Sequence, residues 1–477
     1  MRIFIQIFLG LMCASLFAQS GVQFTNPIPV ANGATYGYLR PKITLDAQNN
    51  PIVLWGKSST HQIFVSTFNG SGFNTPVQIN PVGTHPYIAT WYNADIKSTG
   101  DTIIAVFPTD MPANRVFLVK SIDGGNTWSD TIRVDSIPAG GIAYFPSCDI
   151  NEWGEIAVTY MQHDAGWANP RYVVTTSHNG GNTFLPDVNA SGVVTGEVCD
   201  CCPAHIEYDN DRQVLIFRNN DNNVREFYSS VSVDNGASFN AFNIDQQAWY
   251  VNLCPSVAPS AMIAYDSLIT VFMSGATGSN RIYVSTSTIN GLQVGFTQMI
   301  DNALPAGTLQ NHPKMAGKDS IMAMVWYNTM PGEADVYFRF SNTGAAGLIG
   351  DGINISNPTT GTQQNPDIAY ANGTFHIIYQ NNATQEIYYL QAILDEYVNV
   401  DEASMNNYRW FIQGDMLSIE LLENTHPGSF LLCDVKGNVL QQTTIESNLL
   451  QIDLNQLSKG VYFFQVGGMR KPVKFIR

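Results

Sequence analysis

The residues best suited to chemistry in this sequence are cysteines in its middle part. The stretch EVCDCCPAH at 197–205 holds three of them, and the group comprises Cys148, Cys199, Cys201, Cys202 and Cys254. Cys202-Pro203 and Cys254-Pro255 stand at similar places in neighbouring repeats, so disulfides are one hypothesis, for instance between Cys202 and Cys254. The alternative is a copper or zinc site with thiolate and imidazole ligands. Its candidate histidines are His85, His205 and His312.

Arginines form a second group with a regular spacing. One begins the third strand of four successive repeats, and another precedes a proline in the first repeat: Arg115, Arg171, Arg225, Arg281 and Arg40. Because the guanidinium fork suits carboxylates and sulfates, one hypothesis is a site for an anionic glycan. The other is that each arginine pairs with a nearby carboxylate as part of the repeat. His163 and Asp164 lie on the same predicted face and could act as a general acid–base pair.

Short β-strands must position these residues. An apolar run such as TIIAVF at 102–107, a polar loop and a second run such as VFLVKS at 116–121 recur seven times between about residues 20 and 395. The period of roughly 54 residues is that of four-stranded propeller blades. The seventh copy lacks a fourth strand, and residues 22–30 resemble one, so the N-terminal strand is expected to complete the last blade. The sequence predicts an all-β, seven-bladed propeller, with six blades as the alternative.

The turns between third and fourth strands carry the motif S-x-D-x-G-x-T-W or a variant of it. The Asp or Asn side chain is expected to accept backbone N–H groups across the turn, and the glycine to supply a positive φ. Copies stand about 55 residues apart. Their residues are Ser121, Asp123, Gly125, Thr127 and Trp128, then Ser177, Asn179 and Gly181, then Ser232, Asp234 and Gly236.

Three such boxes in phase resemble the sialidase/BNR-repeat superfamily of Asp-box propellers. The resemblance implies that the boxes are structural and lie on the face opposite the binding site. Sialidases hold the substrate carboxylate with three arginines, the first in an R-I-P motif, where this chain has Leu39-Arg40-Pro41. The resemblance implies recognition of an anionic glycan and, if the protein is an enzyme, exo-sialidase-like hydrolysis. A metal-binding, adhesive or protein-binding surface propeller without catalysis is the alternative.

Both ends of the chain indicate export. Arg2, the apolar run 3–11 and Ala18-Gln19 predict a signal peptide over 1–18. The propeller is predicted over 19–397, a polar linker over 398–410 and a small β-sandwich over 411–477. No later segment is apolar over a length that spans a membrane. The net charge of −16 argues against a nucleic-acid partner, which requires a basic surface.

The last 70 or so residues carry a specific order of glycines, apolar and aromatic residues. The matching positions are Asp434, Gly437, Leu457, Gly460, Tyr462 and Lys474-Phe475-Ile476. This order resembles the type A sorting domain of type IX secretion in Bacteroidota. The resemblance implies that the type IX secretion machinery takes the chain across the outer membrane, where it is released or attached to the cell surface.

Overall fold

A computed structural model describes residues 21–395, except 112, 193, 290–291, 302, 331–332 and 357–360. It also describes residues 408–476, except 414, 422–428, 435–437, 445–446, 448 and 467–472. The chain divides into two compact units, Met1–Leu394 and Asp395–Arg477. The signal peptide predicted over 1–18 and most of the linker predicted over 398–410 lie outside the described residues.

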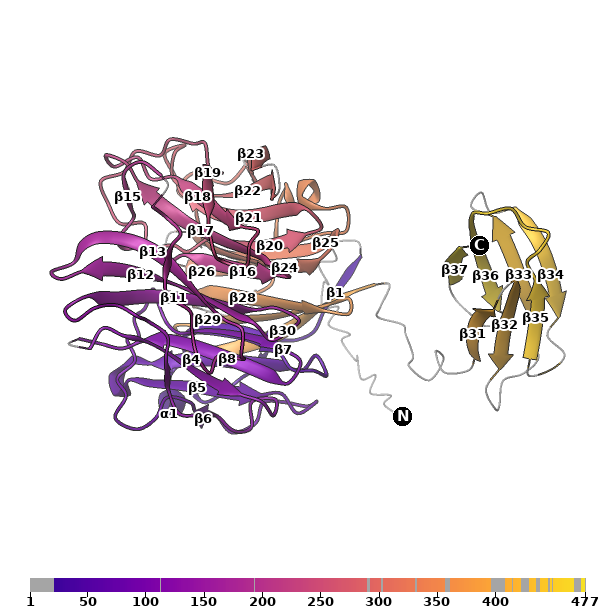
Figure 1. Ribbon diagram of the computed structural model, residues 1–477, viewed down its shortest axis with the longest axis horizontal. Helices are drawn as coiled ribbons and strands as arrows, with labels where there is room; N and C mark the ends of the chain where they lie inside the picture. The colour runs from indigo at the N-terminus through magenta and orange to yellow at the C-terminus, as the bar shows by residue number, and fades with distance from the viewer. Residues whose placement is uncertain are drawn as a thin grey trace, which may run out of the picture. The chain divides into compact units, whose positions relative to one another are not determined.

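The described part of the first unit forms seven antiparallel sheets, one for each repeat seen in the sequence (Figure 1). The first three sheets are β3–β6 (Leu39–Leu45, Pro51–Lys57, Gln62–Thr67, Val77–Gln78), β7–β10 (Asp95–Thr99, Thr102–Pro108, Val116–Ser121, Ile132–Arg133) and β11–β14 (Ile142–Ile150, Ile156–Asp164, Ala168–Ser177, Val188–Asn189). The fourth is β15–β19 (Glu197–Val198, His205–Asp209, Arg212–Asn220, Phe227–Ser232, Asn240–Asn243).

The remaining sheets continue the same order. They are β20–β23 (Ser260–Ala264, Ser267–Ser274, Arg281–Thr288, Gln293–Met299), β24–β27 (Leu309–Lys318, Ile321–Met330, Glu333–Ser341, Ile353–Asn354) and β28–β30 (Gln363–Ala371, Thr374–Asn381, Glu386–Leu394), joined by β1 (Val22–Phe24) and β2 (Ile28–Pro29). Helical structure is limited to α1 (Gly33–Tyr36), η1 (Ser58–Thr60) and η2 (Ala345–Leu348) among the described residues.

The sheets are arranged as a ring. One strand of each sheet contacts the corresponding strand of the next, in the order β3, β7, β11, β16, β20, β24 and β28, and β28 contacts β3 again. These seven strands surround the axis, and apolar residues of neighbouring sheets pack in shared clusters. The architecture is therefore a β-propeller, as predicted, and each sheet is one blade.

The N-terminal strand closes the ring. β1 pairs with β30, with Val22 opposite Leu394 and Phe24 opposite Ala392, and in Figure 1 the indigo β1 lies beside the orange end of the propeller. Val22 is buried in a cluster with Phe340 and Leu394. This confirms the expected completion of the last blade and leaves it with no open edge at β30.

The Asp-box turns form the predicted hydrogen bonds. Asp123 accepts from the Thr127 backbone N–H at 2.9 Å and from the Thr127 hydroxyl at 2.6 Å, while the Ser121 hydroxyl accepts from Gly125 N–H at 2.9 Å. The third and fourth blades repeat the two contacts from backbone N–H groups. The Gly124 N–H donates to Asp101 O, in the turn between first and second strands. The boxes therefore share one face with those turns. We call the opposite face, built by the second-to-third loops and the links between blades, the loop face.

A bulge recurs where four of the axial strands begin. The residue before proline takes a positive φ of 47–51° at Arg40, Phe145, His312 and Asn365. The pairing register shifts at the same positions. A bulge re-aims the side chain of its extra residue, so the repeat directs residues from separate blades toward the axis.

The second unit is a small β-structure of two sheets in its described residues. One contains β31 (Tyr408–Gln413), β32 (Met416–Leu421) and β35 (Leu449–Asp453). The other contains β34 (Val439–Thr444), β33 (Ser429–Asp434), β36 (Val461–Val466) and β37 (Val473–Ile476). Leu417, Ile419, Phe430 and Phe464 from both sheets share one core, which is the sandwich arrangement expected from the sequence.

Closure of the ring gives a direct prediction. Val22→Asp places a carboxylate in the core between the first and last strands, and we expect the free energy of unfolding to fall by about 3 kcal/mol or more. Gln23→Asp, at the exposed neighbour on the same strand, should change it by no more than about 0.5 kcal/mol. Urea unfolding of the two variants measures the difference. Equal stability would show that β1 does not hold the last blade.

Candidate functional site

The bulges bring Arg40, His312 and Asn365 together at the axis. Arg40 and His312 were candidate site residues from the sequence. The Arg40 guanidinium lies 3.3 Å from His312 Nδ1 and also donates to Asn365 Oδ1. Burial and the charge of Arg40 hold the pKa of His312 well below its usual range, so the ring is neutral and can accept this bond. Burial also lowers the pKa of Arg40 to about 10. The arginine is held by blades six and seven, which leaves it in a fixed position.

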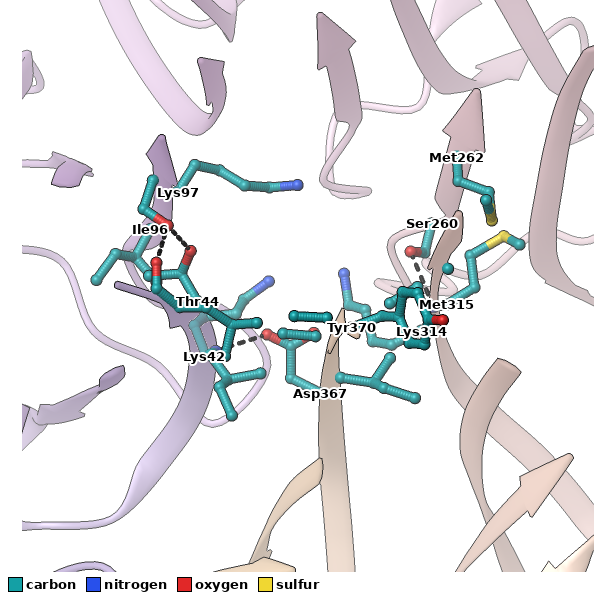
Figure 2. Close-up of a pocket in the computed structure, with 18 of the residues that line it drawn as sticks. Lys42, Thr44, Ile96, Lys97, Ser260, Met262, Lys314, Met315, Asp367 and Tyr370 are labelled. Atoms are coloured by element: carbon teal, nitrogen blue, oxygen red, sulfur yellow. Dashed lines mark hydrogen bonds between the residues drawn. The ribbon is translucent and has the colours of Figure 1, made fainter. Parts of the chain in front are cut away.

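A cavity of about 480 Å³ lies along the axis between the first strands of six blades. Figure 2 shows the ammonium groups of Lys42, Lys97 and Lys314 pointing into it. Carboxylates stand close by. Lys42 Nζ lies 3.5 Å from Asp95, and Lys97 Nζ lies 3.8 Å from both Asp149 and Glu207. The cavity is therefore lined by a mixed network of charges.

The charges in this network compensate one another unevenly. Burial opposes ionisation of Asp95, but the charges of Lys42, Lys97 and Lys314 hold its pKa well below its usual range. For Lys314 burial is the largest influence, and with the nearby charge of Lys42 it lowers the pKa to about 7. Burial likewise raises the pKa of Asp149 to about 7. The channel is a place where protonation changes near neutral pH.

Aromatic side chains gather on the loop face of blades two and three. Tyr144 lies 4.9 Å from Tyr87 and 5.8 Å from Trp167, ring centre to ring centre, and Tyr87 lies 6.3 Å from Trp91. We call these four rings the aromatic patch. Tyr87 and Trp91 come from the link between the first two blades, Tyr144 from β11 and Trp167 from the loop between β12 and β13. Trp167 keeps 47% of its surface exposed.

The predicted His163-Asp164 pair borders the aromatic patch. His163 is buried, its ring centre lies 5.1 Å from that of Trp167, and its Nδ1 lies 3.3 Å from Trp167 O. Burial lowers the pKa of His163, so its ring is neutral and supports the tryptophan. Asp164 is half-buried and accepts a 2.9 Å bond from Arg171 and a 2.8 Å bond from Asn169. Only Asp164 of this pair faces solvent.

The other predicted arginines have separate partners. Arg115 donates to Gly141 O at 2.9 Å and Arg281 to Thr308 O at 2.6 Å, so each fastens the start of the following blade. Arg225 donates to Val251 O at 3.1 Å in the same way, and also to Cys199 Sγ at 2.8 Å. The sequence predicted that the arginines pair with nearby carboxylates. The Arg171–Asp164 ion pair is one such contact. The described contacts place the five arginines around the ring, each bound to its own partners.

The cysteines form a disulfide, but with a different pairing from the example predicted. Cys201 is bonded to Cys254, and Cys202 instead lies 2.9 Å from Cys199, sulfur to sulfur. The pairing of Cys202 with Cys254 was wrong because Cys202 is turned into the core, where it is fully buried. Cys148 is buried on β11, and burial raises its pKa.

The structure does not join the histidines to the cysteines. Among the described residues, the groups close enough to share a metal ion are Cys199, Cys201 and Cys202, and Asp200, Cys201 and Cys254. His205 instead bonds to Glu207 at 2.6 Å on the wall of the axial cavity. The His85 ring lies 5.3 Å from that of His61, and His312 stacks on Tyr327. The mixed thiolate–imidazole ligand set considered from the sequence is therefore not assembled.

Sequence reasoning missed the axial lysines and the aromatic patch. A signal for the lysines was present, because Lys42, Lys314 and Asp367 each follow the proline of an X-Pro pair in their own blade. For the aromatic patch, the sequence shows aromatic residues in polar loops. No regular spacing relates the segment 79–94, between the first two blades, to the loop 165–167. Only the packing of two blades brings them together.

A ring of antiparallel sheets around a lined channel defines the first unit as a β-propeller. The second unit indicates how the chain is exported. Residues 413–475 match the secretion system C-terminal sorting domain family. This domain indicates export across the outer membrane to a secreted or cell-surface location. Among the described residues, no helix combines the length and apolar character needed to cross a membrane.

No curated protein matches the sequence. Among solved structures, a protein of unknown function from Dyadobacter fermentans DSM 18053 is 12% identical with a TM-score of 0.48, and the match covers 79% of this chain and 100% of that one. The sialidase of Trypanosoma rangeli in complex with the inhibitor DANA is 10% identical with a TM-score of 0.44, covering 92% and 84%. PorZ, a surface component of the type IX secretion system of Porphyromonas gingivalis, is 11% identical with a TM-score of 0.42, covering 91% and 59%.

The low pKa of Lys314 predicts a pH dependence. The unfolded lysine titrates near 10.4 and the folded one near 7. The unfolded chain therefore binds more protons between these values, and the contribution of Lys314 to stability rises with pH across that window. Lys314→Met removes the effect. We expect the free energy of unfolding of this variant to exceed that of the wild type by more than about 1 kcal/mol at pH 7. The difference should be smaller at pH 9.

Urea unfolding at several pH values measures this difference. Lys318→Met, at the exposed end of the same strand, is the matched control and should track the wild type throughout. A constant difference between wild type and Lys314→Met from pH 7 to pH 9 would contradict the prediction.

Proposed function

We propose that this exported propeller binds an anionic glycan on its loop face, through the aromatic patch and the adjacent Arg171–Asp164 pair. The observation that supports the proposal is the exposure of Trp167 within a packed set of rings. The C–H face of a sugar ring is apolar and packs on an aromatic face, while its hydroxyls need donors and acceptors beside it. The patch and the ion pair offer both.

The aromatic patch is rigid enough to act as a binding platform. Trp167 sits in a left-handed turn with φ of 66°, and His163 holds its backbone and ring from below. Tyr144 is fixed between Tyr87 and Trp167. Rings held in place before binding lose little conformational entropy when a ligand arrives, which favours affinity.

Arginines near the patch support a preference for anionic glycans. Arg171 is one-quarter exposed beside Trp167, and Arg115 bonds to Gly141, just before the strand that carries Tyr144. With a net charge of −16, the chain repels anions at long range, so recognition of an acidic sugar depends on such local cations. The Arg171–Asp164 pair is partly exposed, and its partners can exchange for ligand groups at small cost.

The proposal concerns binding rather than hydrolysis. A sialidase-like reaction needs three arginines on one carboxylate, and the described contacts fasten Arg115, Arg225 and Arg281 to backbone carbonyls of separate blades. Arg40 is committed to His312 and Asn365. The arginine geometry therefore supports recognition through one or two cations at the aromatic patch.

A glycan array followed by titration calorimetry tests the proposal. Trp167→Ala should weaken binding of the best glycan at least about tenfold, because a stacking face is lost. Trp153→Ala is the matched control, since Trp153 is 61% exposed in the turn between β11 and β12, away from the loop face. Failure of the wild type to retain any glycan, or equal loss in both variants, would reject the proposal.

The charge preference has its own test. Arg171→Gln should reduce the affinity for carboxylated or sulfated glycans about tenfold, while affinity for their neutral counterparts changes less. The same titrations measure both. Equal losses for charged and neutral sugars would show that Arg171 contributes to the platform but does not select for charge.

A further inference from the structure

The axial strand of blade four is interrupted where the cysteines lie. β15 and β16 both pair with β17, and residues 199–204 leave the sheet between them. The other described blades show at most a bulge at this position. The Cys201–Cys254 disulfide joins this excursion to the link leading into blade five. Cys254 is exposed, whereas Cys199 and Cys202 are fully buried beneath it.

Three sulfur atoms lie close together within this excursion. Cys199 Sγ is 2.9 Å from Cys202 Sγ and 3.6 Å from Cys201 Sγ, which is already part of the disulfide. A free thiol pair therefore stands in contact with a disulfide. This is the arrangement from which thiol–disulfide exchange proceeds, by attack of a thiolate on a neighbouring disulfide sulfur.

Arg225 gives Cys199 the character of a nucleophile. Its guanidinium is buried, and its described contacts are Val251 O and Cys199 Sγ, at 2.8 Å from the sulfur. A buried cation requires a nearby anion, and the Cys199 thiolate supplies it. The bond from Cys202 and the charges of Arg218 and Arg225 outweigh burial and lower the pKa of Cys199 to about 7, while burial raises that of Cys202.

The same guanidinium argues against a metal ion at these sulfurs. A metal cation at Cys199, Cys201 and Cys202 would sit beside the positive charge of Arg225, and one of its three ligands is already bonded to Cys254. Like charges in a buried site raise the cost of binding steeply. The geometry favours sulfur redox chemistry over metal coordination.

We propose that Cys199, Cys202 and the Cys201–Cys254 disulfide form a thiol–disulfide exchange site. The Cys199 thiolate attacks Cys201 Sγ, a Cys199–Cys201 bond forms, and the Cys201–Cys254 bond breaks. The electron pair leaves with Cys254, which takes a proton from solvent. Cys202, after losing its proton, then attacks Cys199 and releases Cys201 as a thiolate. One disulfide and two thiols exist before and after, so no external oxidant is consumed.

The exchange converts a buried dithiol into one that consists of the half-buried Cys201 and the exposed Cys254. In the starting arrangement the disulfide fastens blade four to the link before blade five, and in the product Cys201 and Cys254 are free to react with an external disulfide. Arg225 stabilises the thiolate form of Cys199, which is the form that attacks the disulfide. The ligand class of this site is accordingly an accessible disulfide or thiol.

Trapping of Cys254 tests the exchange. Purified full-length protein that holds the Cys201–Cys254 disulfide and the free Cys199 and Cys202 thiols, with no reductant present, is treated with iodoacetamide under native conditions and mapped by peptide mass spectrometry. Cys254 can be alkylated only after exchange, and Cys433 in the sorting domain serves as an internal clock. We expect Cys254 to be labelled in the wild type and at least about tenfold more slowly in Cys199→Ser.

Four further variants separate chemistry from misfolding. Cys202→Ser should still allow labelling of Cys254 but prevent the Cys199–Cys202 disulfide. Arg225→Gln keeps every sulfur and should slow labelling, Arg225→Lys should restore part of the rate, and Arg281→Gln, at the equivalent place in the next blade, should leave it unchanged. The proposal is overturned if wild-type Cys254 stays unlabelled after Cys433 has reacted completely. It is also overturned if Cys199→Ser labels Cys254 at the wild-type rate.

Discussion

The structure depends on closing a ring of sheets whose faces cannot be buried singly. A four-stranded blade exposes two apolar faces, and only a neighbour on each side covers both. The pairing of β1 with β30 completes the ring, because the start of the chain provides the strand that the seventh sheet lacks. With the ring closed, first strands of all blades face one axis. Every functional feature of the propeller follows from what those strands and their connecting loops place near it.

Crowding at the axis explains the charged channel. Side chains alternate along a strand, so half of each first strand must point toward its counterparts from the other blades. Lysines and carboxylates meet there and compensate each other, as Lys97 does with Asp149 and Glu207. Where compensation is incomplete, as at Lys314, the protein carries a group whose protonation responds to neutral pH. The loop face has no such constraint, and there aromatic rings remain partly exposed.

Much of the fold could be predicted from the sequence, because period and turn chemistry are local. The motif around Asp123 specifies a turn, and its recurrence specifies where the blades lie. The completion of the last blade by the N-terminal strand was also predictable from the pattern of strands. Side-chain partners were harder to predict, because they depend on how neighbouring blades pack. Cys201 rather than Cys202 meets Cys254 since residues 199–204 leave the sheet, and nothing in the order of residues specifies that departure. The aromatic patch likewise exists only once two blades have packed.

Placing the first strand in the last sheet has a consequence for the order in which the protein assembles. β1 stays without its partner until β30 is available, and the paired residues Phe24 and Ala392 stand 368 positions apart in the chain. The propeller therefore cannot reach its native state from the N-terminal side alone. Closing the ring requires a contact between residues far apart in sequence, and folds that depend on such contacts form slowly relative to those built from local contacts. The residues that match the sorting-domain family begin at 413, soon after β30 ends at Leu394, so the export signal is synthesised shortly after the last strand that the ring needs in order to close.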